Sequence, residues 1–213
     1  MRGTPLRHSL LRSVNNFRCK AWDVIHGVDT CGEIPLGSFD FDSRNKTSGL
    51  EYHSHHPSII RSGLNSSGID FQKYIFIDYG CGKGRALLVA SEFPFRRVIG
   101  LEFVPQLSEI ARQNVRKYRS RQRSRRNIEV VTADATEYQL PDEAAFLYFY
   151  SPFSPAVMEA VFRNIESSLE RSPRELLVLF TGLFKKRDLA FGRPPYERMI
   201  RQKYFDLYRR VPA

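Results

Sequence analysis

The chain of 213 residues has no apolar run that approaches the roughly 20 residues a membrane-spanning helix needs, so we expect a soluble protein. It also has little cysteine: Cys19, Cys31 and Cys81 are odd in number and form no C-x-x-C pair. This scarcity predicts neither a disulfide framework nor a zinc ribbon, and it favours a reducing compartment, which we take to be the cytoplasm. Internal repeats and low-complexity tracts are absent as well.

Residues 1–22 contain no acidic side chain, but they contain several arginines and a lysine. Such a composition superficially resembles an organellar transit peptide. Leu6, Leu10, Val14 and Phe17 nevertheless have helical spacing. The spacing favours a structural helix that docks on a domain.

The formal net charge is +10, and part of this excess lies in one basic stretch, residues 116–126. Such a run can follow a phosphate backbone or contact an acidic partner. It is also typical of a solvated helix end. We favour the second interpretation because Tyr118 is the one aromatic residue among the basic side chains, and stacking on bases needs more. The basic residues are Arg116, Lys117, Arg119, Arg121, Arg123, Arg125 and Arg126.

From residue 74 onward, short apolar runs alternate with helical patterns, which is typical of a parallel sheet covered by helices. Residues 144–150 are apolar throughout, as a strand buried on both faces requires. Ser154 and Pro155 begin a helix, because Ser caps helices well and Pro suits the first helical position. We expect strands at residues 74–78, 97–102, 128–132, 144–150, 176–180, 198–200 and 204–208, the last two as a hairpin.

Residues 1–72 lack this alternation. We expect them to form an N-terminal helical lid, with one short helix near residues 57–64. Residues 73–213 then form a single α/β domain.

The most informative motif is Asp78-Tyr79-Gly80-Cys81-Gly82-Lys83-Gly84, between the first expected strand and a helical stretch. Glycine at every second position lets the backbone turn sharply and lets a nucleotide lie against main-chain atoms. The dinucleotide fingerprint needs glycine at position 85, where Arg85 stands, so a nicotinamide-dependent oxidoreductase is disfavoured. A Walker loop needs Ser or Thr at position 84, which is glycine here.

Acidic residues recur after successive strands. Glu102 ends the second strand, 18 positions beyond Gly84, where a carboxylate can accept hydrogen bonds from ribose hydroxyls. Asp134 follows the third strand; by itself it is also a common turn or capping residue. With Asp78, these acids create a favourable field for a cationic cofactor.

Together these residues resemble the pattern of class I S-adenosylmethionine-dependent methyltransferases over roughly residues 74–210. The resemblance implies a Rossmann-like α/β fold: a seven-stranded, mostly parallel sheet with an antiparallel seventh strand and helices on both faces. It implies S-adenosylmethionine as the cofactor, with Asp134 at the position that binds the adenine amino group. The implied cofactor-binding residues are Asp78, Tyr79, Gly80, Gly82, Gly84, Glu102, Asp134 and Ala135.

The loop after the fourth strand, residues 150–153, stands where methyltransferases of planar amino groups carry Asn, Asp or Ser, then Pro-Pro and an aromatic residue. There, oxygen atoms accept the two N–H bonds and the aromatic face stacks on the planar group. This chain has one proline at that place, which disfavours base methylation. Ser151, Pro152 and Phe153, together with Tyr52, are the candidate residues around the transferred methyl. The alternative is a loop that merely ends the strand.

Two N-terminal stretches, residues 27–32 and 51–57, resemble a group of small bacterial methyltransferases that is distantly similar to the histone-lysine methyltransferases acting on the nucleosome face. In such enzymes this segment closes over the cofactor, which would bring Tyr52 and Pro57 to it. His53, His55 and His56 have no further Cys or His ligands to complete a set, so we expect no metal.

The sequence therefore predicts an S-adenosylmethionine-dependent methyltransferase. We expect it to methylate a nitrogen atom, either of a lysine or other amine of a protein or of a small molecule. We expect no membrane partner. One alternative is an RNA or DNA methyltransferase that uses the basic stretch. Another is a non-catalytic, basic nucleic-acid-binding protein on the same fold.

Overall fold

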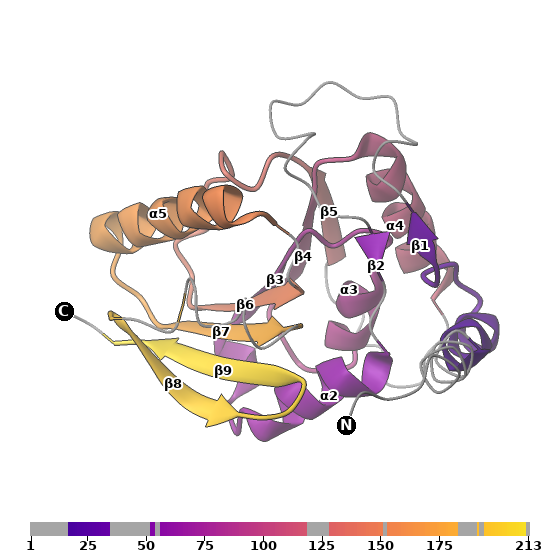
Figure 1. Ribbon diagram of the computed structural model, residues 1–213, viewed down its shortest axis with the longest axis horizontal. Coiled ribbons are helices and arrows are strands. Elements are labelled where there is room, and N and C mark those ends of the chain that lie inside the picture. The colour runs from indigo at the N-terminus through magenta and orange to yellow at the C-terminus, as the bar shows by residue number, and fades with distance from the viewer. Residues whose placement is uncertain are drawn as a thin grey trace, which may run out of the picture.

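The computed structural model describes residues 17–34, 52–53, 56–118, 128–150, 153–182, 191 and 194–211. Seven of the described strands form one sheet in the order β5-β4-β3-β6-β7-β9-β8 (Figure 1). The strands are β3 (Ile75–Tyr79), β4 (Val98–Glu102), β5 (Ile128–Thr132), β6 (Ala145–Tyr150), β7 (Leu176–Thr181), β8 (Tyr196–Arg201) and β9 (Phe205–Arg210). From β5 to β7 all neighbours are parallel, whereas β9 is antiparallel to β7 and to β8. The predicted seven-stranded sheet with an antiparallel last strand is confirmed.

The central strands are apolar because both of their faces are covered. In β3, Ile75 and Ile77 join one hydrophobic cluster, while Phe76 joins the cluster on the opposite face. In register, β3 lies between β4 and β6, with Asp78 opposite both Gly100 and Tyr148. Parallel strands end at one edge of a sheet, so residues after β3, β4, β5 and β6 gather at this carboxyl edge.

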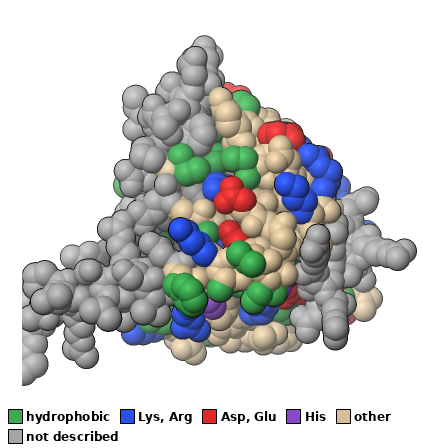
Figure 2. Space-filling model, turned by 90° about the vertical axis from the view of Figure 1, so that its right-hand side faces the viewer, with side chains coloured by type: hydrophobic (Ala, Val, Ile, Leu, Met, Phe, Trp, Pro, Cys, Tyr) green, Lys and Arg blue, Asp and Glu red, His purple; other side chains and the backbone are tan. Residues whose placement is uncertain are grey.

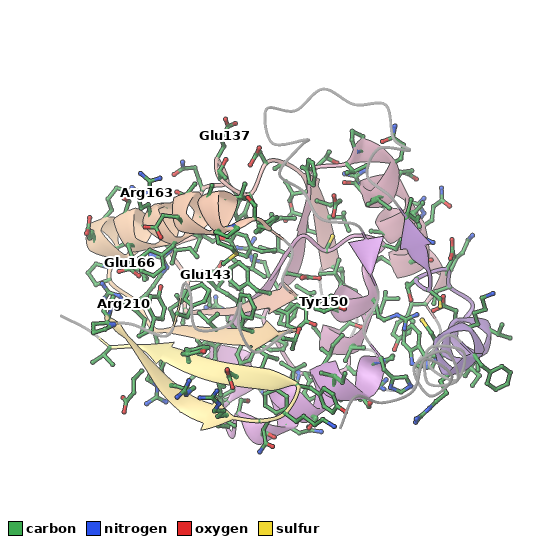
Figure 3. All side chains as sticks on the ribbon, viewed as in Figure 1. Glu137, Glu143, Tyr150, Arg163, Glu166 and Arg210 are labelled. Atoms are coloured by element: carbon green, nitrogen blue, oxygen red, sulfur yellow. The ribbon has the colours of Figure 1, made fainter. Side chains whose placement is uncertain are left out.

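Helices lie on both faces of the sheet (Figure 1). One face is covered by α5 (Pro155–Arg171), which Ser154 caps by accepting a hydrogen bond from the Val157 amide at 3.5 Å. Its Glu166 accepts a hydrogen bond of 3.1 Å from Arg210 Nη2 on β9 (Figure 3). The other face is covered by α2 (Pro57–Ser66), α3 (Arg85–Ala90) and α4 (Pro105–Lys117).

The N-terminal part packs on the same side of the sheet as α2. Residues 17–26 are helical, and Trp22 is buried in one cluster with Ile60 and Leu64 of α2. A small antiparallel ladder of β1 (Glu33–Ile34) and β2 (Tyr52–His53) was not expected from the sequence. The division of the chain into an N-terminal lid, residues 1–72, and a single domain, residues 73–213, stays a prediction. None of the described helices combines the length and hydrophobicity that crossing a bilayer requires.

Candidate cofactor site

The glycine turn, residues 80–84, connects β3 to α3 at the carboxyl edge of the sheet. Gly80, Gly82 and Gly84 all have positive φ, at 81°, 53° and 87°. L-amino acids with a Cβ rarely adopt this conformation, which explains why glycine stands at every second position. A Cβ at Gly84 would also come within 3.2 Å of the Ala111 Cβ on α4. The spacing seen in the sequence is thus a requirement of the backbone.

Glu102 lies at the carboxyl end of β4, beside this turn. Its side chain is buried, Oε2 accepts a hydrogen bond of 2.8 Å from the Gly82 amide, and Oε1 accepts one of 3.0 Å from the Val104 amide. Burial raises the pKa of Glu102 to about 7, although these amide bonds act in the opposite direction. At neutral pH the carboxyl group is therefore close to its titration midpoint, and small changes in its surroundings decide its charge.

Asp78 lies in β3, immediately before the turn, and is only 3 % exposed. No residue in the described part of the chain donates a hydrogen bond to its carboxylate. Burial, with a further contribution from the charge of Glu102, raises the pKa of Asp78 well above its usual value. A buried acid that accepts no hydrogen bond from the described residues suits a ligand that brings a positive charge or hydrogen-bond donors.

Asp134 follows β5 and forms a local turn. Its Oδ1 accepts hydrogen bonds from the Thr136 amide at 2.9 Å and from Thr136 Oγ1 at 2.7 Å. The next residue, Ala135, is buried in the cluster on the α5 face. This turn stabilises the loop at the carboxyl edge, and the role of Asp134 toward an adenine stays a prediction.

Two of the predicted site residues have side chains in the core. Tyr79 is fully buried and stacks on Phe149, with ring centroids 4.8 Å apart. Phe153 is 8 % exposed and belongs to the same cluster. Tyr79 can therefore present its main chain, rather than its ring, to the carboxyl edge.

The remaining predicted site residues lie wholly or partly outside the part of the chain that the structure describes. Ser151 and Pro152 lie outside the described residues, directly after Tyr150, the last residue of β6 (Figure 3). Tyr52 belongs to β2, but its side chain also lies outside the described part. Residues 119–126, which are most of the basic stretch, lie outside the described part too. Within the described ranges, no three His, Cys, Asp or Glu side chains are grouped so that they could hold a metal ion.

The burial of Arg85 and Lys83 was not predicted from the sequence. Arg85 is 4 % exposed, and its Nη2 lies 2.8 Å from Asp23 Oδ1. Lys83 is 6 % exposed, and its Nζ lies 3.0 Å from Asp29 Oδ1. The one available signal was that Arg85 opens an otherwise apolar helix, where a solvated side chain was unexpected.

The sequence between β3 and the end of α5 is also recognisable by comparison. Residues 76–172 match the sequence model of a family described as a methyltransferase domain. These residues include the glycine turn, Glu102 and Asp134. Residues 76–172 form a methyltransferase domain. The prediction of a methyltransferase domain is therefore confirmed. No curated protein matches the chain.

Solved structures share the fold of the methyltransferase domain. Precorrin-6y C5,15-methyltransferase from Geobacter metallireducens is 16% identical, with a TM-score of 0.53, over 84% of this chain and 100% of that one. A SAM-dependent methyltransferase from Aquifex aeolicus is 15% identical, with a TM-score of 0.52, over 74% of this chain and 100% of that one. The 23S rRNA methyltransferase ErmE is 14% identical, with a TM-score of 0.50, over 75% of this chain and 69% of that one. These names point to different acceptors, so the shared fold does not define the acceptor of this chain.

Proposed function

We propose that this methyltransferase binds S-adenosylmethionine against the glycine turn and transfers its methyl group to a nitrogen, either a lysine amine of a protein or the amine of a small molecule. The observation that carries the proposal is the turn itself. Three glycines with positive φ leave this turn without side chains at every second position, and Glu102 holds the central one by accepting a hydrogen bond from the Gly82 amide. Asp78 lies beside them without a donor from the described residues, as a site for a cationic ligand requires.

Each acid has a distinct role in this proposal. Glu102 accepts hydrogen bonds from the ribose hydroxyls, Asp78 supplies negative charge near the glycine turn, and Asp134 accepts a hydrogen bond from the adenine amino group. When bound, the sulfonium supplies an already activated methyl group, so little acid–base catalysis is needed. The protein contributes alignment of the acceptor and exclusion of water.

The acceptor amine must be neutral when it attacks, or lose its proton to a nearby group. Tyr150, at the carboxyl end of β6, is partly buried and lies at the same edge as the glycine turn. Ser151, Pro152, Phe153 and Tyr52 complete the proposed acceptor side.

Calorimetric titration of the full chain with S-adenosylmethionine, and separately with its demethylated product S-adenosylhomocysteine, tests the cofactor site. We expect micromolar binding of both ligands, which Gly82→Arg abolishes. Gly68→Arg is the matched control, because Gly68 also has a positive φ, of 64°, but a Cβ there would meet nothing within 4 Å. Equal binding by parent and Gly82→Arg would refute the site.

A nucleic acid is the second candidate acceptor, and the β8–β9 turn is the observation that favours it. Arg201, Lys203 and Tyr204 are exposed there, and Lys203 Nζ lies 4.9 Å from the centre of the Tyr204 ring. The Tyr204 carbonyl accepts a hydrogen bond of 3.5 Å from Gly182, so this turn lies beside the carboxyl end of β7. Basic and aromatic side chains together are typical of surfaces that bind single-stranded nucleic acid. The face in Figure 2, by contrast, mixes positive and negative side chains.

Labelled methyl transfer distinguishes these acceptors. The full chain is incubated with labelled S-adenosylmethionine and either total RNA, total protein or a small-molecule extract, and the labelled fraction is identified. Label in protein or in small molecules supports the amine proposal, and label in RNA supports the second candidate. RNA binding that weakens steeply with salt but transfers no methyl group would instead support the non-catalytic binding protein.

A further inference from the structure

The N-terminal segment, residues 22–31, is attached to the glycine turn by buried charged side chains. We propose that this segment, the clamp, positions the turn for binding of the cofactor. In this arrangement, Asp23 acts through Arg85, and Asp29 with Asn114 acts through Lys83. The inference rests on the proposed cofactor site, and it adds residues that do not themselves touch the cofactor.

The first attachment joins the start of α3 to the clamp. Arg85 donates from Nη2 to Asp23 Oδ1 at 2.8 Å and from Nε to Thr30 Oγ1 at 2.7 Å. Asp23 also accepts hydrogen bonds of 2.7 Å from the amides of Thr30 and Cys31, so one carboxylate organises the clamp and holds Arg85. Trp22 completes the enclosure, because the guanidinium of Arg85 lies 5.1 Å from the centre of its ring.

The second attachment holds the residue before Gly84. Lys83 donates from Nζ to Asp29 Oδ1 at 3.0 Å and to the Cys31 carbonyl at 3.2 Å. Asn114 of α4 donates from Nδ2 to the carbonyl of Lys83 at 2.9 Å and to that of Asp29 at 2.7 Å. Asn114 thus bridges the main chain of the turn and the main chain of the clamp.

These attachments fix the turn at the positions that alternate with its glycines. Glycines permit many backbone conformations, so a turn rich in glycine needs external contacts to remain in one of them. The side chains of Lys83 and Arg85 provide these contacts on either side of Gly84, while Glu102 holds Gly82 from the sheet. A preorganised backbone binds its ligand more tightly because less order must be gained on binding.

Substitution of Asp23 tests the first attachment. We expect Asp23→Asn to raise the Kd of the full chain for S-adenosylhomocysteine, measured by calorimetry, at least about tenfold, because the turn loses its external contact. The matched control is Glu166→Gln, which breaks another partly buried ion pair, Arg210 Nη2 to Glu166 Oε2 at 3.1 Å, between β9 and α5. That pair does not contact the glycine turn, so the control should change Kd less than about twofold.

The variant Asp23→Asn also removes the carboxylate that pairs with the buried charge of Arg85, which destabilises the fold in its own right. The double variant Asp23→Asn/Arg85→Gln removes this charge but still lacks the attachment. If the clamp positions the turn, the thermal unfolding midpoint of the double variant recovers toward that of the parent while its binding of S-adenosylhomocysteine stays weak. Recovery of both the midpoint and the Kd would overturn the proposal.

Trp22, the sole tryptophan of the chain, reports directly on the clamp. In the double variant we expect altered Trp22 emission with unchanged far-ultraviolet circular dichroism. If Asp23→Asn does not fold, Asp29→Asn tests the second attachment, since the side chain of Asp29 is 70% exposed and its replacement is tolerated more easily. We expect Kd to rise by about threefold in that variant, and an unchanged Kd would count against the clamp.

The parent protein separates the two hypotheses. If the parent fails to bind S-adenosylhomocysteine, the proposed cofactor site is wrong. If the parent binds and Asp23→Asn and Asp29→Asn bind equally well, the cofactor site stands and the clamp is wrong.

Discussion

At the scale of single residues, we expect Glu102 to make cofactor binding dependent on pH. Burial raises its pKa to about 7, so it gains charge between pH 6 and 8. An ionised carboxylate accepts hydrogen bonds from ribose hydroxyls better than a protonated one, so binding should release a proton. We expect the Kd for S-adenosylhomocysteine to fall by about tenfold from pH 6 to pH 8. Calorimetry in buffers of different ionisation enthalpy measures both the affinity and the proton release.

The carboxyl group of Glu102 also affects the stability of the free protein, which should fall with rising pH whereas the affinity for the cofactor rises. A raised pKa means that the fold binds a proton more tightly than the unfolded chain does. Stability is therefore lost as the pH rises from the ordinary value, 4.5, toward about 7. Position 102 cannot titrate in Glu102→Gln, so the Kd of this variant should depend less on pH than the Kd of the parent, and at pH 8 it should bind about 1–3 kcal/mol more weakly. A parent Kd that is constant across this range would show that Glu102 does not contact the ligand.

Asp78 gives a second prediction at this scale. Its pKa is raised mainly by burial, so ionisation of Asp78 costs stability as the pH rises above the ordinary value. Asp78→Asn removes this cost. Its thermal unfolding midpoint should exceed that of the parent at pH 8, and the gain should shrink on acidification. Its affinity for S-adenosylmethionine should fall by about 1–3 kcal/mol, because a charge-assisted contact is lost. If Asp78→Asn is less stable than the parent and binds S-adenosylmethionine as tightly as the parent does, this role of Asp78 is wrong.

At the scale of elements, the contact between α2 and β7 depends on a missing side chain. A Cβ at Gly63 would lie 2.6 Å from Leu179 Cδ2, closer than packed atoms approach. Gly63→Ala would gain helix propensity of about 1 kcal/mol but force Leu179 to move, and such overpacking costs about 1–3 kcal/mol. We expect net destabilisation in urea unfolding. Ser62→Ala, at the exposed neighbouring position, should instead be neutral or stabilising. If Gly63→Ala and Ser62→Ala have the same free energy of unfolding, α2 can shift away from the sheet.

At the scale of the whole molecule, the sheet could be predicted because its strands are local patterns. The expected strand at residues 128–132 has the bounds that the structure shows, and the ends of the others differ by at most two residues. The ladder of β1 and β2 could not be predicted, because it joins two-residue segments far apart in sequence without apolar alternation. Local patterns determine elements, whereas pairing between distant short segments depends on the tertiary structure.

The same limit applies to the candidate site. The glycines and acids were found because turn geometry and strand ends impose fixed positions on them. The role of Arg85 was missed because arginine is rarely buried unless it is paired, and its partner Asp23 lies 62 positions earlier. The acceptor residues remain predictions, since Ser151 and Pro152 lie outside the described residues.

One hydrophobic cluster contains Trp22 of the clamp, α2 and α3 together with the central strands, so the molecule should unfold as a unit. Trp22 emission and far-ultraviolet circular dichroism should therefore report the same thermal midpoint. At a concentration of about 100 Kd, S-adenosylhomocysteine should stabilise the native state by about 2.7 kcal/mol, which raises that midpoint by about 5–10 °C. Both signals should move together because the ligand site and the clamp share this cluster. An earlier, ligand-insensitive Trp22 transition would show that the N-terminal segment unfolds independently of the methyltransferase domain.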